Sequence, residues 1–194
     1  TAPALASLYA VKKDEQYLET LISRIASASA SLGPPEPVER REGRSRVPGL
    51  AHNRRWHLAD GGVATNPPRM HPPLLRPEGP VDDEVVSIGV SAPEGTMRAV
   101  FVSVSNHTDT TGGSRVSADW PGVMEREMRL TLGRDVIVFP VVGAAGNINH
   151  FDFTRAMEQT SRAEAERLGA AYARAALAGL AAPRPLAAAP LGCS

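Results

Sequence analysis

The sequence has a single cysteine, no excess of either charge and no long apolar run, and each of these absences excludes a class of protein. Cys193 alone cannot form an internal disulfide or a cysteine-rich metal site. The 21 basic and 21 acidic residues cancel, which excludes a strongly basic surface for nucleic acid or anionic membranes. No apolar stretch approaches the roughly 20 residues that span a bilayer. We therefore expect no transmembrane segment and no nucleic-acid partner, and the cellular compartment stays open.

Glycine and proline, in contrast, are abundant. Each occurs 17 times in 194 residues, and their combined share exceeds the usual value of about 12%, which indicates long loops. The length suits one domain with its own core, or part of a larger domain. Because the sequence starts with Thr1 rather than methionine, and no signal-peptide pattern follows, we expect a fragment or a processed product.

The centre of the sequence has the pattern of a strand, a helix and a second strand. The expected elements are a strand at 98–104, a polar loop at 105–118, a helix at 119–132, a strand at 136–142 and a polar loop at 143–153. Such βαβ crossovers almost always join parallel strands. The predicted fold is therefore α/β, with a parallel or mixed sheet, helices packed on it, a βαβ unit at 98–150, and a place within a larger domain. Both loops should leave the carboxyl edge of the sheet, where ligands bind.

Other elements flank this unit. The expected ones are a helix from Asp14 to about Leu32, a charged strand within 36–46, an ordered loop over 48–80, a strand at 85–90, and a helix from the capping box of Ser161 and Glu164 to about Leu180. Asp119 is expected to cap the central helix. Residues 1–180 are predicted as one domain segment, complete or incomplete, and 181–194 as a linker or a truncated continuation.

His107 is the first candidate for chemistry, because it directly follows a buried strand and is surrounded by small polar residues. Neutral imidazole is a common zinc ligand, and Asp109 would point the same way in an extended loop. The alternative is a histidine that only satisfies loop carbonyls. A catalytic zinc needs three protein ligands, and this pattern shows one or two.

Two further segments carry candidate groups. Arg54, next to Asn53, could clamp a carboxylate or a developing oxyanion, although surface arginines are more often solvated. The small residues from Gly143 to Asn147 would let a ligand approach closely, or would simply form a tight turn. His150 is a candidate for proton transfer. The remaining histidines are interpreted as ordinary loop residues: His52, His57 and His71.

The order and spacing of these segments resemble the neutral/alkaline ceramidase family, and more closely the uncharacterised bacterial ceramidase-like proteins related to it. The resemblance spans about Leu5 to Leu180, and no single segment is specific by itself. The matching segments are Asn53-Arg54-Arg55, Thr65-Asn66-Pro67, Gly79-Pro80-Val81-Asp82, Asn106-His107, Ser117-Ala118-Asp119-Trp120-Pro121-Gly122, and Gly143-Ala144-Ala145-Gly146-Asn147-Ile148-Asn149-His150.

The resemblance implies an amide-hydrolysing α/β domain with one catalytic zinc. His107 matches a zinc-binding histidine of the family, and Arg54 matches an arginine of its substrate site. Asn149 occupies the position of the family's essential serine, and because asparagine offers no hydroxyl nucleophile, this change argues against ceramide as the substrate. The family's other zinc ligands would precede Thr1 and follow Ser194, so the chain looks like the middle of a catalytic domain.

We therefore expect a zinc-dependent hydrolase segment that cleaves an amide bond in a small or lipid-like substrate with metal-activated water. The remainder of the catalytic domain would complete the site. The expected site residues are Arg54, Asn149 and His150 for catalysis, Asn53, Gly146 and Asn147 for substrate binding, and His107 for the metal. The alternative is a non-catalytic binding or assembly module that has lost the metal. A third hypothesis, an N-terminal nucleophile hydrolase that uses Thr1, has no strand pattern nearby to support it.

Overall fold

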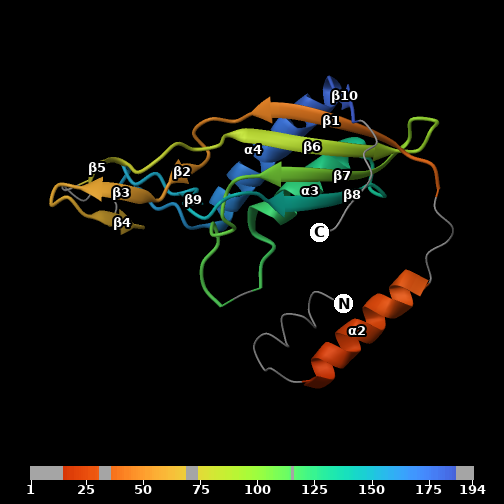
Figure 1. The fold of residues 1–194 in the computed structure, drawn as a ribbon, viewed down its shortest axis with the longest axis horizontal. Helices are drawn as coiled ribbons and strands as arrows, with labels where there is room; N and C mark the ends of the chain where they lie inside the picture. Colours follow the sequence, from red (N-terminus) through yellow and green to blue (C-terminus); the bar gives the residue numbers. More distant parts are fainter. Residues whose placement is uncertain (1–14, 31–35, 69–73, 115, 187–194) are drawn as a thin grey trace, which may run out of the picture. The chain divides into compact units, whose positions relative to one another are not determined.

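The computed structural model describes residues 15–30, 36–68, 74–114 and 116–186. The chain divides into two units between Pro37 and Val38. In the first unit, the helix α2 spans Glu15–Ala30, and both ends predicted for it lie outside the described residues. The second unit holds every other described element (Figure 1). The single domain segment expected over 1–180 stays a prediction. No described helix has the length and apolar character needed to cross a membrane.

A five-stranded sheet forms the body of the second unit. Its strand order is β10 (Arg184–Pro185), β1 (Glu39–Arg46), β6 (Glu84–Ser91), β7 (Met97–Val104) and β8 (Ile137–Val142). Neighbouring strands are antiparallel except for β7 and β8, which are parallel and are joined by the helix α3 (Asp119–Leu132). The predicted α/β fold with a mixed sheet is confirmed. β10 also attaches the start of segment 181–194 to β1.

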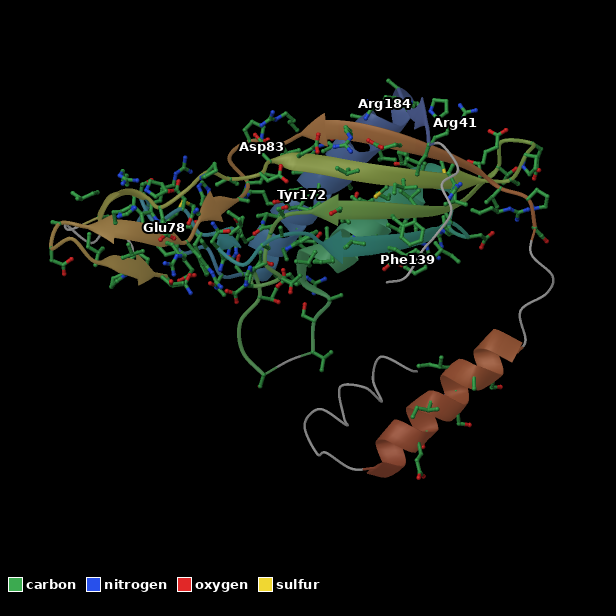
Figure 2. All side chains as sticks on the ribbon, in the orientation of Figure 1. Arg41, Glu78, Asp83, Phe139, Tyr172 and Arg184 are labelled. Atoms are coloured by element: carbon green, nitrogen blue, oxygen red, sulfur yellow. The ribbon has the colours of Figure 1, made fainter. Side chains whose placement is uncertain are left out.

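Helices α3 and α4 pack on one face of this sheet (Figure 1). α4 spans Arg162–Ala181, and the side chain of its N-cap Ser161 accepts a hydrogen bond from the Glu164 N–H (Oγ···N 3.1 Å), as the predicted capping box requires. The buried side chains between the helices and the sheet include Val85, Val100, Val102, Val104, Trp120, Met124, Met128, Val138, Leu168 and Tyr172. On the other face, Phe101 stacks on Phe139, labelled in Figure 2, with ring centroids 4.8 Å apart.

β1 forms a strand although most of its residues are charged. Alternate side chains of a strand point to opposite faces, so Gly43 and Ser45 face α4 while Glu42, Arg44 and Arg46 lie on the opposite face. The Ser45 hydroxyl donates a hydrogen bond to the Ala175 carbonyl (2.8 Å). A Cβ atom on Gly43 would lie 2.4 Å from the carbonyl carbon of Gly179. Two glycines therefore let the backbones of the strand and the helix touch.

The described residues of segment 48–80 do not form the single ordered loop that we predicted. They form β2 (His52–Asn53), β3 (Arg55–Leu58), β4 (Val63–Thr65) and β5 (Leu74–Pro77), and the order β4-β3-β5 makes a second, three-stranded sheet. These strands are two to four residues long, too short for an alternating pattern to be recognised among the prolines. The carboxyl ends of β7 and β8 point toward this small sheet (Figure 1).

We expect Gly169→Ala to destabilise the fold, although alanine usually stabilises a helix by about 1 kcal/mol relative to glycine. A Cβ atom on Gly169 of α4 would lie 2.5 Å from the Val123 Cβ and 2.6 Å from the Trp120 carbonyl oxygen. Forcing α3 and α4 apart should cost about 1–3 kcal/mol in denaturant unfolding. Ala178→Gly, at an exposed position of α4, is the control and should cost only its helix propensity. A more stable Gly169→Ala protein would contradict the tight contact.

Candidate functional site

The candidate site is built on a short segment, Gly146–Asn149, which we call the site turn. Its last two residues form β9 and pair with β2, so that Asn53 lies opposite Ile148 and His52 lies opposite Asn149. This pairing brings the loop that follows β8 against the chain that enters the small sheet. Two segments that are far apart in the sequence therefore meet at the carboxyl edge of β7 and β8.

Three successive carbonyls of the site turn bind the two main candidate residues. The Gly146 carbonyl accepts two hydrogen bonds from the Arg54 guanidinium, from Nε at 3.2 Å and from Nη2 at 2.9 Å. The Asn147 carbonyl accepts the backbone N–H of Arg54 at 2.8 Å. The Ile148 carbonyl bonds to His107 Nδ1 at 2.8 Å. The turn therefore fixes an arginine and a histidine that lie 92 and 41 positions away from their partners in the sequence.

The hydrogen bond to Ile148 also fixes the tautomer of His107. A carbonyl can only accept, so Nδ1 carries the hydrogen, and the neutral ring has its lone pair on Nε2. Trp120 Nε1 donates to the His107 carbonyl at 2.8 Å and anchors the backbone at this point. The ring is half-buried, and no residue in the described part of the chain bonds to Nε2. His107 thus satisfies a loop carbonyl and still presents a free nitrogen.

Asp119 does not cap α3 as we predicted. The N-cap is Ala118, and Asp119 is the first helical residue, with a positive φ of 52°. Its buried carboxylate accepts hydrogen bonds of 2.5 to 2.9 Å from the N–H and hydroxyl groups of Thr110 and Thr111 and from the N–H of Trp120. Burial favours the neutral acid, but the hydrogen bonds outweigh it and lower the pKa of Asp119. Asp119 therefore fastens the loop after β7 to α3.

Asn149, the last residue of the site turn, and His150, which follows it, are buried rather than in the solvent. Asn149 is 0% exposed, with its Oδ1 accepting from the His150 N–H (2.6 Å) and its Nδ2 donating to Asp109 Oδ2 (3.1 Å). His150 is 1% exposed, and its Nε2 donates to the Gln159 carbonyl (2.8 Å). The buried Nδ1 of His150 has no partner within the described ranges, and burial lowers the pKa of the ring. The catalytic roles of both residues remain predictions.

The structure brings most of the predicted site residues together. Arg54, Asn147 and His107 meet at the site turn, and the side chain of Asn53 lies buried next to it, with Oδ1 accepting from the Arg55 N–H (3.0 Å). His57 lies on β3 in the small sheet, and His71 lies outside the described residues. Sequence reasoning missed the Ile148 carbonyl, because a backbone group can come from any residue and leaves no signal in the sequence.

A cavity of about 500 Å³ lies beside Phe151 and Phe153, which follow the site turn in the sequence. It is lined by Asn66, Pro67, Pro68, Phe151, Phe153, Glu158 and Thr160. Phe151 directly follows His150, and the Asn66 N–H donates to the Arg54 carbonyl at 2.8 Å, so this cavity borders the candidate residues. A larger cavity of about 710 Å³ lies at the N-terminal ends of α3 and α4, but neither Arg54 nor His107 lines it. Arg54, His107 and the residues of the site turn do not line the smaller cavity either, and its link to the site runs through Phe151 and Asn66.

No protein-family model matches the chain, and no curated protein matches its sequence. Among solved structures, the fold is similar to the neutral ceramidase from Pseudomonas aeruginosa, with a TM-score of 0.60 and 12% identity, covering 87% of this chain. It is also similar to a ceramidase complexed with C2, with a TM-score of 0.56 and 13% identity, covering 76% of this chain. The chain spans about a quarter of these ceramidase chains, 26% and 23% respectively. The likeness shows a ceramidase-like fold for this region.

We expect Asp119→Asn to destabilise the second unit by about 2–3 kcal/mol, since hydrogen bonds to a charged group contribute roughly 1.5–3 kcal/mol each and an amide cannot accept the same set. The loss should appear as a lower denaturant midpoint. Asp135→Asn replaces an exposed carboxylate and is the matched control, with an expected change within about 0.5 kcal/mol. Equal stability of the two variants would show that Asp119 does not fasten the loop.

We expect His150 to make the fold less stable as the pH falls below the ordinary histidine pKa of 6.5. Because burial lowers the pKa of His150 in the fold, the unfolded chain takes up a proton that the folded chain does not. The neutral His150 ring therefore costs the fold no stability above pH 6.5. The stability falls as the pH decreases from 6.5 toward the lowered pKa of His150 in the fold. His150→Gln should reduce the fall in Tm between about pH 7.5 and about pH 5.5 by about 2–4 °C, equivalent to ~1 kcal/mol.

The pKa of His52 is also lowered by burial, although the Asp152 carboxylate opposes this shift. His52→Gln should therefore remove a separate part of the same pH dependence, and the double variant should lose both parts. If the Tm of His150→Gln falls with pH as much as that of the unchanged protein, the His150 ring takes up its proton within the fold, and the prediction is wrong.

Proposed function

We propose that this chain is part of a zinc-dependent hydrolase of the ceramidase family that cleaves an amide bond in a small or lipid-like substrate. One observation carries this proposal: the site turn holds Arg54 by the Gly146 carbonyl and His107 by the Ile148 carbonyl, so a guanidinium and an imidazole lone pair meet at one edge of the sheet. The ceramidase-like fold and the motif resemblance support the same class of reaction.

The donor chemistry at His107 fits a zinc ligand. Its Nε2 lone pair is free among the described residues, while the Ile148 carbonyl holds the other ring nitrogen, as carbonyls commonly do for metal-bound histidines. A catalytic zinc takes three protein ligands. Within residues 15–30, 36–68, 74–114 and 116–186, no group of three metal-binding side chains occurs. We therefore assign the missing ligands to the rest of the catalytic domain.

When bound, zinc activates water for attack on an amide carbonyl. Arg54 is suited to stabilise the oxyanion that develops, because the Gly146 carbonyl occupies Nε and Nη2 and leaves the Nη1 hydrogens for a substrate oxygen. The cavity beside Phe151 and Phe153 would provide about 500 Å³ for the part of the substrate that does not react. Asn149 has an amide in place of a hydroxyl, which favours direct attack by water over a covalent intermediate.

A non-catalytic binding or assembly module is the second candidate. The observation that favours it is that the described residues contain no group of three metal-binding side chains, whereas a complete catalytic zinc site needs three protein ligands. Metal analysis of the full-length protein separates the two candidates. The hydrolase should contain one zinc per chain, whereas the binding module should contain none and should not titrate with zinc.

We expect His107→Ala in the full-length protein to remove the bound zinc and to lower kcat/KM for a fluorogenic N-acyl amide by more than ~100-fold, since even outer-shell partners of metal ligands cost about 10–100-fold. Zinc content by elemental analysis and the rate of amide cleavage are the two measurements. His57→Ala, at a half-buried histidine of β3, is the control and should retain both properties. A His107→Ala protein that keeps its zinc and its amidase activity would overturn the proposal.

A further inference from the structure

The face of the five-stranded sheet opposite α3 and α4 is apolar over three strands, and we call it the outer face. Side chains of a strand alternate between the two faces, and the buried Val100, Val102 and Val138 mark the face that packs on the helices. The register of β6, β7 and β8 then places three rows of side chains on the outer face: Val86, Ser103 and Val141; Ile88, Phe101 and Phe139; Val90, Ala99 and Ile137. All of them except Ser103 are apolar.

The outer face is exposed within the second unit. Phe101 is 41% exposed, Phe139 is 44% exposed and Ile137 is 55% exposed. The two phenyl rings stack on each other, with centroids 4.8 Å apart, rather than on a covering element; Phe139 is labelled in Figure 2. Single exposed apolar side chains are ordinary, whereas contiguous apolar patches mark sites of interaction.

The apolar patch ends at β1. The β1 side chains on this face lie opposite Val90, Ile88 and Val86, and they are Arg40, Glu42 and Arg44. Glu42 Oε1 lies 2.9 Å from Arg184 Nη2, and Arg44 Nη1 lies 2.6 Å from Glu84 Oε2. These charges pair with one another and remain in the solvent, as expected for a strand whose outer side meets water. The change from charged to apolar side chains between β1 and β6 marks where solvent gives way to a covering layer.

The size of the outer face fits one helix. Three strands about 4.8 Å apart and five residues of about 3.3 Å each give a patch of roughly 14 by 17 Å, or about 240 Å². A stable interface between two proteins buries about 800 Å² on each partner, so this patch is too small for one by itself. An α-helix is about 10 Å wide and rises about 1.5 Å per residue, so roughly 12 residues would cover the patch.

The topology indicates that this helix belongs to the same polypeptide. β7 and β8 are parallel, and parallel strands usually lie in sheets that helices cover on both faces. β8 reads Ile-Val-Phe-Pro-Val-Val, with no polar residue on either face, which is typical of a strand buried on both sides. The chain spans 26% of the neutral ceramidase chain that its fold resembles, so a chain of that size has ample length outside the second unit to supply the second layer.

We infer that the outer face binds an amphipathic helix of the full-length chain, contributed from outside residues 38–186. The apolar stripe of this helix lies on Phe101, Phe139 and Ile137, and its polar side faces the charged edge at β1. The inference is independent of the proposed function, because it rests on the register and exposure of the strands and needs neither zinc nor amide cleavage.

Hydroxyl-radical footprinting of the unchanged full-length protein tests the inference without a mutation. The labelling rate of each side chain is compared with the rate of the same side chain in the unfolded protein. A covered outer face should slow the labelling of Phe101, Phe139 and Ile137 at least about tenfold, as expected for interior side chains that are about 95% buried. Leu130, which is 64% exposed on α3, is the control and should keep most of its rate. Equal slowing of Phe139 and Leu130 would overturn the inference.

Photocrosslinking then identifies what covers the outer face. Benzoylphenylalanine in place of Phe139 should cross-link within one chain, to a helical peptide from outside residues 38–186. A cross-link between two chains, together with protection that disappears on dilution, would assign the outer face to a second copy and would contradict the inference. Circular dichroism shows whether the substituted protein folds, and if it does not, the footprint of the unchanged protein decides.

Discussion

Three consecutive peptide carbonyls determine where the candidate site lies. The carbonyls of a tight turn cannot pair with one another, so their donors come from elsewhere in the chain or from solvent, and the buried Ile148 carbonyl in particular needs a protein donor. Here the donors are Arg54, through its backbone and its guanidinium, and the ring of His107. The hydrogen bonds that satisfy the carbonyls of the site turn therefore also bring the candidate residues together. Displacing His107 would leave the carbonyl of the buried Ile148 unpaired, at a cost of about 1–3 kcal/mol.

Two histidines have similar hydrogen bonds but differ in burial, and burial decides which of them can bind a ligand. His107 and His150 each donate one ring N–H to a backbone carbonyl at 2.8 Å, so each keeps one nitrogen with a lone pair. In His107 that nitrogen belongs to a half-buried ring at the sheet edge, whereas in His150 it is buried and unpaired in the described structure. Hydrogen bonding sets the tautomer in both cases. Exposure then makes the first ring available to a ligand and leaves the second in the interior.

The sequence predicted the features that rest on side-chain patterns. Apolar runs located β7 and β8, the Ser161 box located α4, and the βαβ rule correctly placed both polar loops at one edge. It failed where contacts rather than patterns determine structure. The strands between Leu50 and Pro80 are too short to show a period, and Asp119 is placed by five hydrogen bonds that no local motif encodes. His107 could be named from its neighbours, but its partner could not.

The short β2–β9 ladder has a consequence for the order in which the molecule forms. Arg54 and Gly146 are 92 positions apart, so their contact closes a long loop in the second unit. Contacts of such separation usually form after local hairpins, because the entropy of the intervening chain must be lost first. On the ribosome, Arg54 emerges long before its acceptors are synthesised. The strands β1, β6 and β7 can therefore pair early, while the candidate site at the sheet edge forms only after the last third of the chain has been synthesised.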